Sequence, residues 1–163
     1  MTAVLSVSGL TLSAAGRTLV SDLSFSIGQR ERVGLIGESG SGKSLTALAA
    51  MGLLPPAITA KGSIRLDGKE VTGAPEHALR RLRGTAAAIV FQEPLTALDP
   101  LMKVGRQVAL PLRRRRLRDG LSTGRGGMEK DLHALFEQVA LPQPQRIANS
   151  YPWELSGGQR QRI

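Results

Sequence analysis

The sequence contains no cysteine, which excludes disulfides and cysteine-ligated metal sites. Aromatic residues are also scarce, at 3% of the chain against 41% for all hydrophobic residues. A core made from this composition must be mostly aliphatic and rich in alanine. With 163 residues, the chain is long enough for one globular domain with a sizeable core.

Long apolar runs are absent as well. No stretch reaches the roughly 18 apolar residues that a membrane-spanning helix needs. The first residues, Met1 to Leu5, carry no basic leader, and the polar Ser6 and Ser8 follow them. We therefore expect no signal peptide and a location in the cytoplasm.

Acidic residues are too few to balance the basic ones, since 13 Asp and Glu face 22 Lys and Arg, a net charge of +9. Such an excess can indicate binding to nucleic acid or to an acidic membrane. Much of it lies in two clusters without interleaved aromatic residues that could stack on bases, namely Arg80, Arg81 and Arg83, and Arg113 to Arg116 with Arg118. This pattern favours solvated helix faces over a nucleic-acid site.

One stretch of small and charged residues, GESGSGKS from Gly37 to Ser44, matches the pattern GxxxxGK[ST]. The apolar run before it, Val33 to Ile36, predicts a buried parallel strand, and Leu45 to Met51 predicts a helix. The glycines would then occupy a strand-to-helix turn, where backbone N–H groups and the positive end of the helix converge on phosphate oxygens. Lys43 would contact the β- and γ-phosphates, and the Ser44 hydroxyl would ligate Mg²⁺.

The flanking segments predict a second kind of sheet. Val4 to Leu12 alternates in polarity with a one-residue slip at Gly9, and Leu19 to Ile27 continues the alternation, which predicts antiparallel strands. Asp67-Gly68 predicts a hairpin turn between Ser63–Leu66 and Lys69–Val71. Pro75 to Arg83 reads as a short basic helix, and Ala86 to Phe91 as another buried strand.

That second buried strand leads into Gln92 and a proline-bounded loop that ends at Pro100. Gln92 is placed to touch Mg²⁺ or an attacking water, although a surface glutamine at a turn would look the same. Beyond it, Val104–Leu110 and Leu132–Val139 predict helices joined by an exposed, mobile connection, Arg113 to Gly127.

The last informative stretch is YPWELSGGQRQR, from Tyr151 to Arg162. Ser156 is a suitable N-cap, and Gly157 and Gly158 leave the first turn of the next helix open to an anion. Taken alone, this is also what an ordinary capped helix start looks like.

With GESGSGKS, FQEP and LSGGQRQR in this order, the chain resembles the ATP-binding cassette (ABC) ATPases, of which LSGGQ is the signature. GESGSGKS, MGLLPP, FQEPLTALDP and YPWELSGGQRQR are similar to the oligopeptide, dipeptide and nickel importer branch. The resemblance covers the whole chain and implies an α/β fold. It would consist of an incomplete P-loop NTPase core with an N-terminal antiparallel β subdomain, in residues 1–98, and an α-helical subdomain ending in the signature, in residues 99–158.

The resemblance also implies roles for individual residues. ATP and Mg²⁺ would be held by the phosphate loop with Leu45, that is by Gly37, Glu38, Ser39, Gly40, Ser41, Gly42, Lys43, Ser44 and Leu45. Gln92 would be the Q-loop residue, and Ser44 and Gln92 would face the metal. The signature residues Leu155, Ser156, Gly157, Gly158 and Gln159 would cover ATP held by an opposing ATPase subunit.

Partners and location follow from the same resemblance. They are a second ABC ATPase subunit and integral membrane permease subunits, at the cytoplasmic face of the inner membrane, with no nucleic acid. The resemblance does not decide whether the transported solute is a peptide or nickel. It also does not decide whether the two ATPase subunits form a homodimer or a heterodimer.

The chain departs from the family pattern in two places. The aromatic residue that usually stacks on adenine is missing near Ala14, so adenine would rest on aliphatic groups such as Leu12 or Val20. The sequence also stops at Ile163, before the family's Walker B aspartate, catalytic glutamate and switch histidine, and we assign no catalytic role to His77 or His133. We therefore expect the chain to bind ATP without hydrolysing it.

Two functions other than an importer ATPase match parts of the sequence. The chain could be a non-catalytic nucleotide-binding or interaction module, which its missing catalytic residues favour. A DNA-associated ABC ATPase would fit the charge, but the sequence has neither the cysteines of zinc modules nor a long heptad run.

Overall fold

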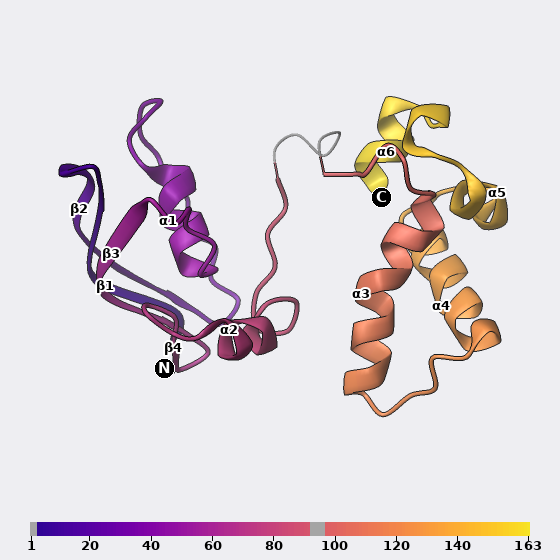
Figure 1. Ribbon diagram of the computed structural model, residues 1–163, viewed down its shortest axis with the longest axis horizontal. Coiled ribbons are helices and arrows are strands. Elements are labelled where there is room, and N and C mark those ends of the chain that lie inside the picture. Colours follow the sequence, from indigo (N-terminus) through magenta and orange to yellow (C-terminus); the bar gives the residue numbers. More distant parts are fainter. Residues whose placement is uncertain (1–2, 92–96) are drawn as a thin grey trace. The chain divides into compact units, whose positions relative to one another are not determined.

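The computed structural model describes residues 3–91 and 97–163, which form two compact units, Met1–Ile89 and Val90–Ile163 (Figure 1). The first contains a β-sheet with two helices, and the second is helical. This is the α/β composition expected from the sequence.

The sheet of the first unit has four antiparallel strands in the order β2-β1-β3-β4. Their bounds are Ala3–Ala14 for β1, Arg17–Gly28 for β2, Ile58–Leu66 for β3 and Lys69–Glu70 for β4. Positive φ angles at Asp67 and Gly68 make the turn between β3 and β4, as the Asp-Gly pair predicts. The antiparallel N-terminal sheet and the hairpin are thus confirmed.

The slip predicted at Gly9 is a β-bulge in β1. The register of β1 against both neighbouring strands shifts there, so that Val7 pairs with Ile64 while Leu12 pairs with Ala60. Because the extra residue restores the alternation, Val7, Leu10 and Leu12 are all buried on one face of the sheet. This face of the sheet forms one side of the hydrophobic core of the first unit.

Two helices pack against that face of the sheet. Helix α1, Lys43–Ala50, contributes Ala49, and helix α2, Glu76–Leu82, contributes Leu79 and Leu82 to one cluster with β1 and β3. Both helices lie close to the predicted segments, Leu45–Met51 and Pro75–Arg83. The phosphate-loop helix therefore rests on an antiparallel sheet through its apolar side.

The two predicted buried strands are wrong in this structure. Val33–Ile36 is irregular and exposed, with Ile36 at 95% exposure. Ala86–Phe91 forms no strand beyond an isolated parallel bridge between Arg83 and Ala87, and Val90 is 94% exposed. A buried parallel strand needs hydrogen-bonded neighbours, and no strand of residues 3–91 or 97–163 pairs with either segment.

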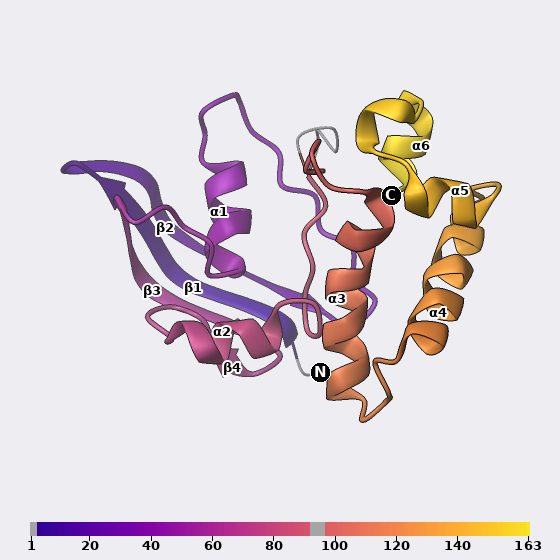
Figure 2. The same ribbon diagram turned by 45° about the vertical axis from the view of Figure 1, so that its right-hand side comes forward.

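The second unit consists of helices around a core of its own (Figure 2). Its elements are α3, Val104–Arg118; α4, Arg125–Gln138; α5, Pro144–Asn149; the 3₁₀ turn η2, Pro152–Glu154; and α6, Gly157–Arg162. Leu112, Phe136 and Ile147 bring α3, α4 and α5 together in that core. None of the helices in the described ranges is long and apolar enough to cross a membrane.

The predicted connection from Arg113 to Gly127 is mostly helical, so that prediction is corrected. Helix α3 continues through Pro111 to Arg118, and α4 already begins at Arg125. Arginine is a good helix former, and cations in the last turn of α3 interact favourably with its free carbonyls. The glycines of this segment therefore predict a longer connection between α3 and α4 than the structure has.

Arg116 is also not a solvated charge. Its side chain is 13% exposed, and it forms an ion pair with Asp131 of α4. Arg116 Nε donates to the Ser122 carbonyl at 2.6 Å, and Nη1 contacts the Gly127 carbonyl at 3.4 Å. One guanidinium thus holds the short α3–α4 connection in place.

We expect Arg116→Ala to lower the free energy of unfolding by about 1–3 kcal/mol, because it removes the buried partner of an ion pair whose Asp131 side chain is 40% exposed, and it removes the donor to the Ser122 carbonyl. Arg115→Ala is the matched control, since Arg115 is 66% exposed and pairs with Asp119 only at 3.6 Å. Such an exposed pair contributes about 0–1 kcal/mol. Urea unfolding followed by circular dichroism measures both, and equal effects would contradict this role of Arg116.

Candidate functional site

The phosphate-loop candidate, Gly37 to Ser44, curls around one side chain. Lys43 Nζ donates to the carbonyls of Gly37 at 2.8 Å and Glu38 at 2.6 Å, and lies 3.3 Å from Ser41 Oγ. A backbone bond from Ser41 N–H to the Glu38 carbonyl, at 3.2 Å, closes the same turn. The ammonium group is therefore held at the centre of the loop by the loop's own oxygens.

The start of α1 offers donors to an anion. Gly42 is the N-cap residue and adopts the left-handed conformation, with φ at 89°. The backbone N–H groups of Lys43, Ser44 and Leu45 make no hydrogen bond to another described residue, whereas Thr46 N–H already bonds to the Gly42 carbonyl. Free N–H groups at the positive end of a helix, beside a lysine, suit phosphate oxygens. The Ser44 side chain is exposed at the same end.

Strand β2 supports this loop at its glycine. A Cβ on Gly42 would lie 2.4 Å from Val20 Cγ2 and 3.2 Å from the Leu19 carbonyl, so only glycine fits. Of the two aliphatic residues suggested for adenine, Leu12 is fully buried in the core and is unavailable to a ligand. Val20 is half-buried beside the loop, and Ala14 is half-buried at the end of β1.

The signature candidate forms a capped helix start in the second unit. Gln159 N–H donates to Ser156 Oγ at 3.3 Å, and Ser156 N–H donates to Gln159 Oε1 at 2.9 Å, which is a capping box. Leu155 is buried in the core of the second unit and anchors the turn. Gly157 and Gly158 are exposed with open space around them. The predicted N-cap at Ser156 is confirmed.

Three further residues considered in the sequence are Gln92, His77 and His133. Gln92 lies outside the described residues, so its metal contact stays a prediction. His77 is exposed on α2, and His133 is half-buried on α4. Gly37 to Leu45 come together in the first unit and Leu155 to Gln159 in the second.

A cationic hollow of about 560 Å³ lies in the second unit between α3, α4 and α5. Lys103, Arg106 and Arg125 line it together with Glu129, and Leu132 contributes to its apolar lining. Arg106 belongs to neither of the two arginine clusters found in the sequence. Lys103 and Arg106 are neighbours at the start of α3, and the packing of α4 beside α3 adds Arg125 to them.

Sequence reasoning missed one residue that bears on the phosphate loop. The sequence pattern places Arg83 in a solvated basic cluster, but its side chain is 21% exposed and contacts the carbonyl end of α1. Helix α1 has no basic residue in its last turn, so a cation from elsewhere in the chain can interact favourably with its carbonyl end. Nothing in the local sequence identifies Arg83 as that cation.

Comparison with known proteins gives a family match and close relatives. A family model described as ABC transporter matches residues 20–163. The oligopeptide transport ATP-binding protein OppD of Mycobacterium tuberculosis is 41% identical over 146 residues, which cover 90% of this chain and 23% of that protein. OppD of Escherichia coli is 40% identical over 146 residues, which cover 90% of this chain and 42% of that protein.

A peptidoglycan transport protein and a solved structure extend these matches. The peptidoglycan transport ATP-binding protein YejF of Agrobacterium fabrum is 43% identical over 146 residues, which cover 88% of this chain and 26% of that protein. The chain thus spans less than half the length of these three curated relatives. The dimeric, post-hydrolysis structure of the ATP-binding cassette MJ0796 bound to ADP and Pi matches with a TM-score of 0.73 at 25% identity, covering 97% of this chain and 66% of that one.

Proposed function

Because the chain belongs to the ABC transporter family, we propose that it is the ATP-binding part of an ABC importer subunit. The family and the α/β fold that the motifs implied are both confirmed by the comparisons. One observation carries the proposal to this chain's own residues. The loop from Gly37 to Ser44 holds a lysine ammonium beside free N–H groups at the start of a helix.

This geometry fits the phosphates of a nucleotide. In the proposal, Lys43 exchanges its contacts with the Gly37 and Glu38 carbonyls for phosphate oxygens, and the N–H groups of residues 43–45 donate to the same oxygens. Ser44 and Gln92 would hold Mg²⁺, which supplies charge neutralisation to the phosphates when bound. Val20 is the aliphatic neighbour of the loop that remains available to the base.

The dimeric structure of MJ0796 suggests a second ATPase subunit, and the transport names of the relatives suggest a membrane transporter. We propose that Ser156 to Gln159 cover a nucleotide held by a second ATPase subunit, as open glycines after a capped serine would allow. The cationic hollow between α3, α4 and α5 supports docking of a permease subunit against the second unit. Oligopeptides are the substrate class that the names of the OppD relatives suggest. We place the subunit at the cytoplasmic face of the membrane as part of the same proposal.

Equilibrium titration of the chain with a fluorescent ATP analogue in the presence of Mg²⁺ tests the proposal. We expect saturable binding that ADP and ATP compete away and that AMP does not, because AMP lacks the β-phosphate that Lys43 would contact. Far-ultraviolet circular dichroism verifies that the chain is folded under the same conditions. A folded chain without saturable binding, or one that AMP displaces as well as ATP, would refute the proposed function.

A further inference from the structure

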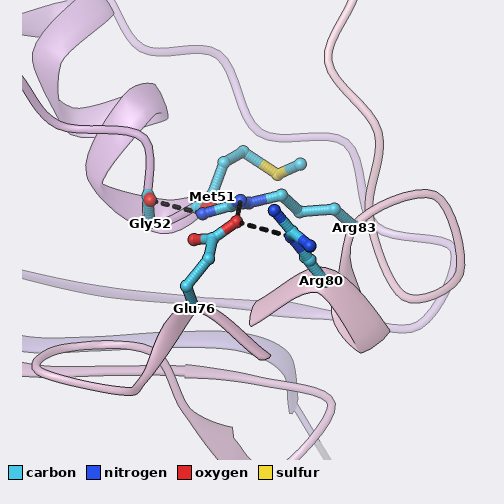
Figure 3. Close-up of polar contacts among 5 residues, drawn as sticks. All are labelled: Met51, Gly52, Glu76, Arg80 and Arg83. Carbon is cyan, nitrogen blue, oxygen red and sulfur yellow. Dashed lines mark hydrogen bonds and ion pairs between the residues drawn. The ribbon is translucent and has the colours of Figure 1, made fainter. Parts of the chain in front are cut away.

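The carbonyl end of the phosphate-loop helix is bound by a residue of another helix. Arg83, the C-cap residue of α2, donates from Nε to the Met51 carbonyl at 2.8 Å and from Nη2 to the Gly52 carbonyl at 2.5 Å. Figure 3 shows the guanidinium lying between these two carbonyls on one side and Glu76 on the other. One planar group thus joins α2 to the residues that end α1.

Helix α1 supplies no cation of its own at that end. It has eight residues and no basic residue in its last turn. The backbone closes on itself through Gly52 N–H to the Ala49 carbonyl and Leu53 N–H to the Leu48 carbonyl, which is a Schellman motif. The carbonyls of Met51 and Gly52 remain for another donor, and a positive charge there is favourable with respect to the helix dipole.

Glu76 fixes the direction in which Arg83 points. Its Oε1 accepts from Arg83 Nη1 at 2.9 Å and from Arg80 Nε at 3.3 Å. The hydrogen bond from Arg83 lowers the pKa of the Glu76 carboxyl, so this group is charged at neutral pH. All three nitrogens of the Arg83 guanidinium therefore have an acceptor.

Apolar packing brings the same two helices into contact beside the guanidinium. Leu79 of α2 is buried in one cluster with Ala49 of α1. A Cβ on Gly52 would lie 2.8 Å from Leu79 Cδ1 and 3.4 Å from Arg83 Nη2. The end of α1 has little room to shift without breaking the bonds to Arg83.

We propose that Arg83 is a positioning residue for the nucleotide, acting through α1. It holds the carbonyl end of α1, and a helix of eight residues transmits that constraint to its other end, where Lys43 and the free N–H groups lie. Among the residues that the structure describes, Arg83 makes no hydrogen bond or ion pair with the phosphate loop. The inference rests on the proposed function, because it assigns a residue that tunes the same nucleotide site.

The test is MgATP affinity of the full chain with Arg83→Ala, Arg83→Lys and Arg80→Ala. We expect about tenfold weaker binding for Arg83→Ala, since two charge-assisted hydrogen bonds that fix α1 are lost. Arg83→Lys keeps the charge on a single nitrogen and should recover part of that loss. Arg80→Ala is the matched control, because Arg80 pairs with the same Glu76 but is 77% exposed and contacts neither Met51 nor Gly52, and it should stay within about twofold of the unchanged chain.

Unfolding midpoints measured on the same samples separate positioning from stability. Affinities are compared at a temperature where circular dichroism shows each variant folded. If Arg83→Ala does not fold, the MgATP affinity of Arg83→Lys is compared with that of the unchanged chain. Lower midpoints with unchanged affinity in the folded variants would overturn the inference and leave the proposed function intact. Absence of nucleotide binding by the unchanged chain would overturn both.

Discussion

Replacing Lys43 with alanine is expected to weaken MgATP binding by about 100-fold. The substitution removes two or more charge-assisted hydrogen bonds to phosphate at roughly 1.5 kcal/mol each, and each 1.4 kcal/mol is a factor of ten. It also removes the contacts of Nζ with the Gly37 and Glu38 carbonyls that shape the loop before a ligand arrives. Titration with a fluorescent ATP analogue measures the loss directly.

Two further variants make this result interpretable. Lys43→Met keeps much of the side-chain length without the charge, and it should lose nearly as much affinity as Lys43→Ala. Lys69→Ala removes an exposed lysine at the β3–β4 turn of the same unit and should leave affinity unchanged. Binding by Lys43→Ala at the level of Lys69→Ala would show that the nucleotide, if bound, does not use this loop.

Gly62→Ala is expected to destabilise the first unit by about 3 kcal/mol or more. Gly62 lies in β3 opposite the bulge of β1, with φ at 95°. A Cβ there would lie 2.4 Å from the Gly9 carbonyl oxygen and 2.6 Å from the Ser8 carbonyl oxygen. Both neighbours are backbone atoms of the central strand, so neither can move aside as a side-chain tip would, and a left-handed alanine adds about 1–2 kcal/mol.

Gly68→Ala is the matched control for that prediction. Gly68 also has a positive φ, 73°, but nothing lies within 4 Å of its added Cβ. Gly68→Ala therefore costs only the strain of placing alanine at a positive φ, about 1 kcal/mol of unfolding free energy. Urea unfolding of both variants should separate the steric clash from the strain of a positive φ. Equal losses of unfolding free energy would mean that β1 and β3 can move apart near Gly9 and Gly62 without an energetic cost.

The parts of the fold that depend on local signals were predictable from the sequence. Asp67-Gly68 indicates its turn because both residues must reach positive φ, and Ser156 indicates a helix start because its hydroxyl can cap the N–H of Gln159. The bulge at Gly9 was visible as a break in alternation, since a face can stay buried only if an extra residue restores the period. The phosphate-loop candidate itself was found in the same way.

Interactions between distant residues were not predictable in this way. Val33–Ile36 and Ala86–Phe91 have the composition of buried strands, but strand formation depends on neighbours that composition does not reveal. Arg83 and Arg116 look like their exposed neighbours Arg81 and Arg115 in the sequence. Only the fold shows that one caps α1 and the other closes the α3–α4 connection.

The pairing order β2-β1-β3 also has a kinetic consequence. A two-residue turn, Ala15-Gly16, joins β1 to β2, whereas β3 reaches β1 only after the connection 29–57 that carries the phosphate loop and α1. Hairpins close in about 1–10 μs, and longer loops cost more entropy to close. We therefore expect the phosphate loop to assemble late, so that a nucleotide bound there would slow unfolding without accelerating folding.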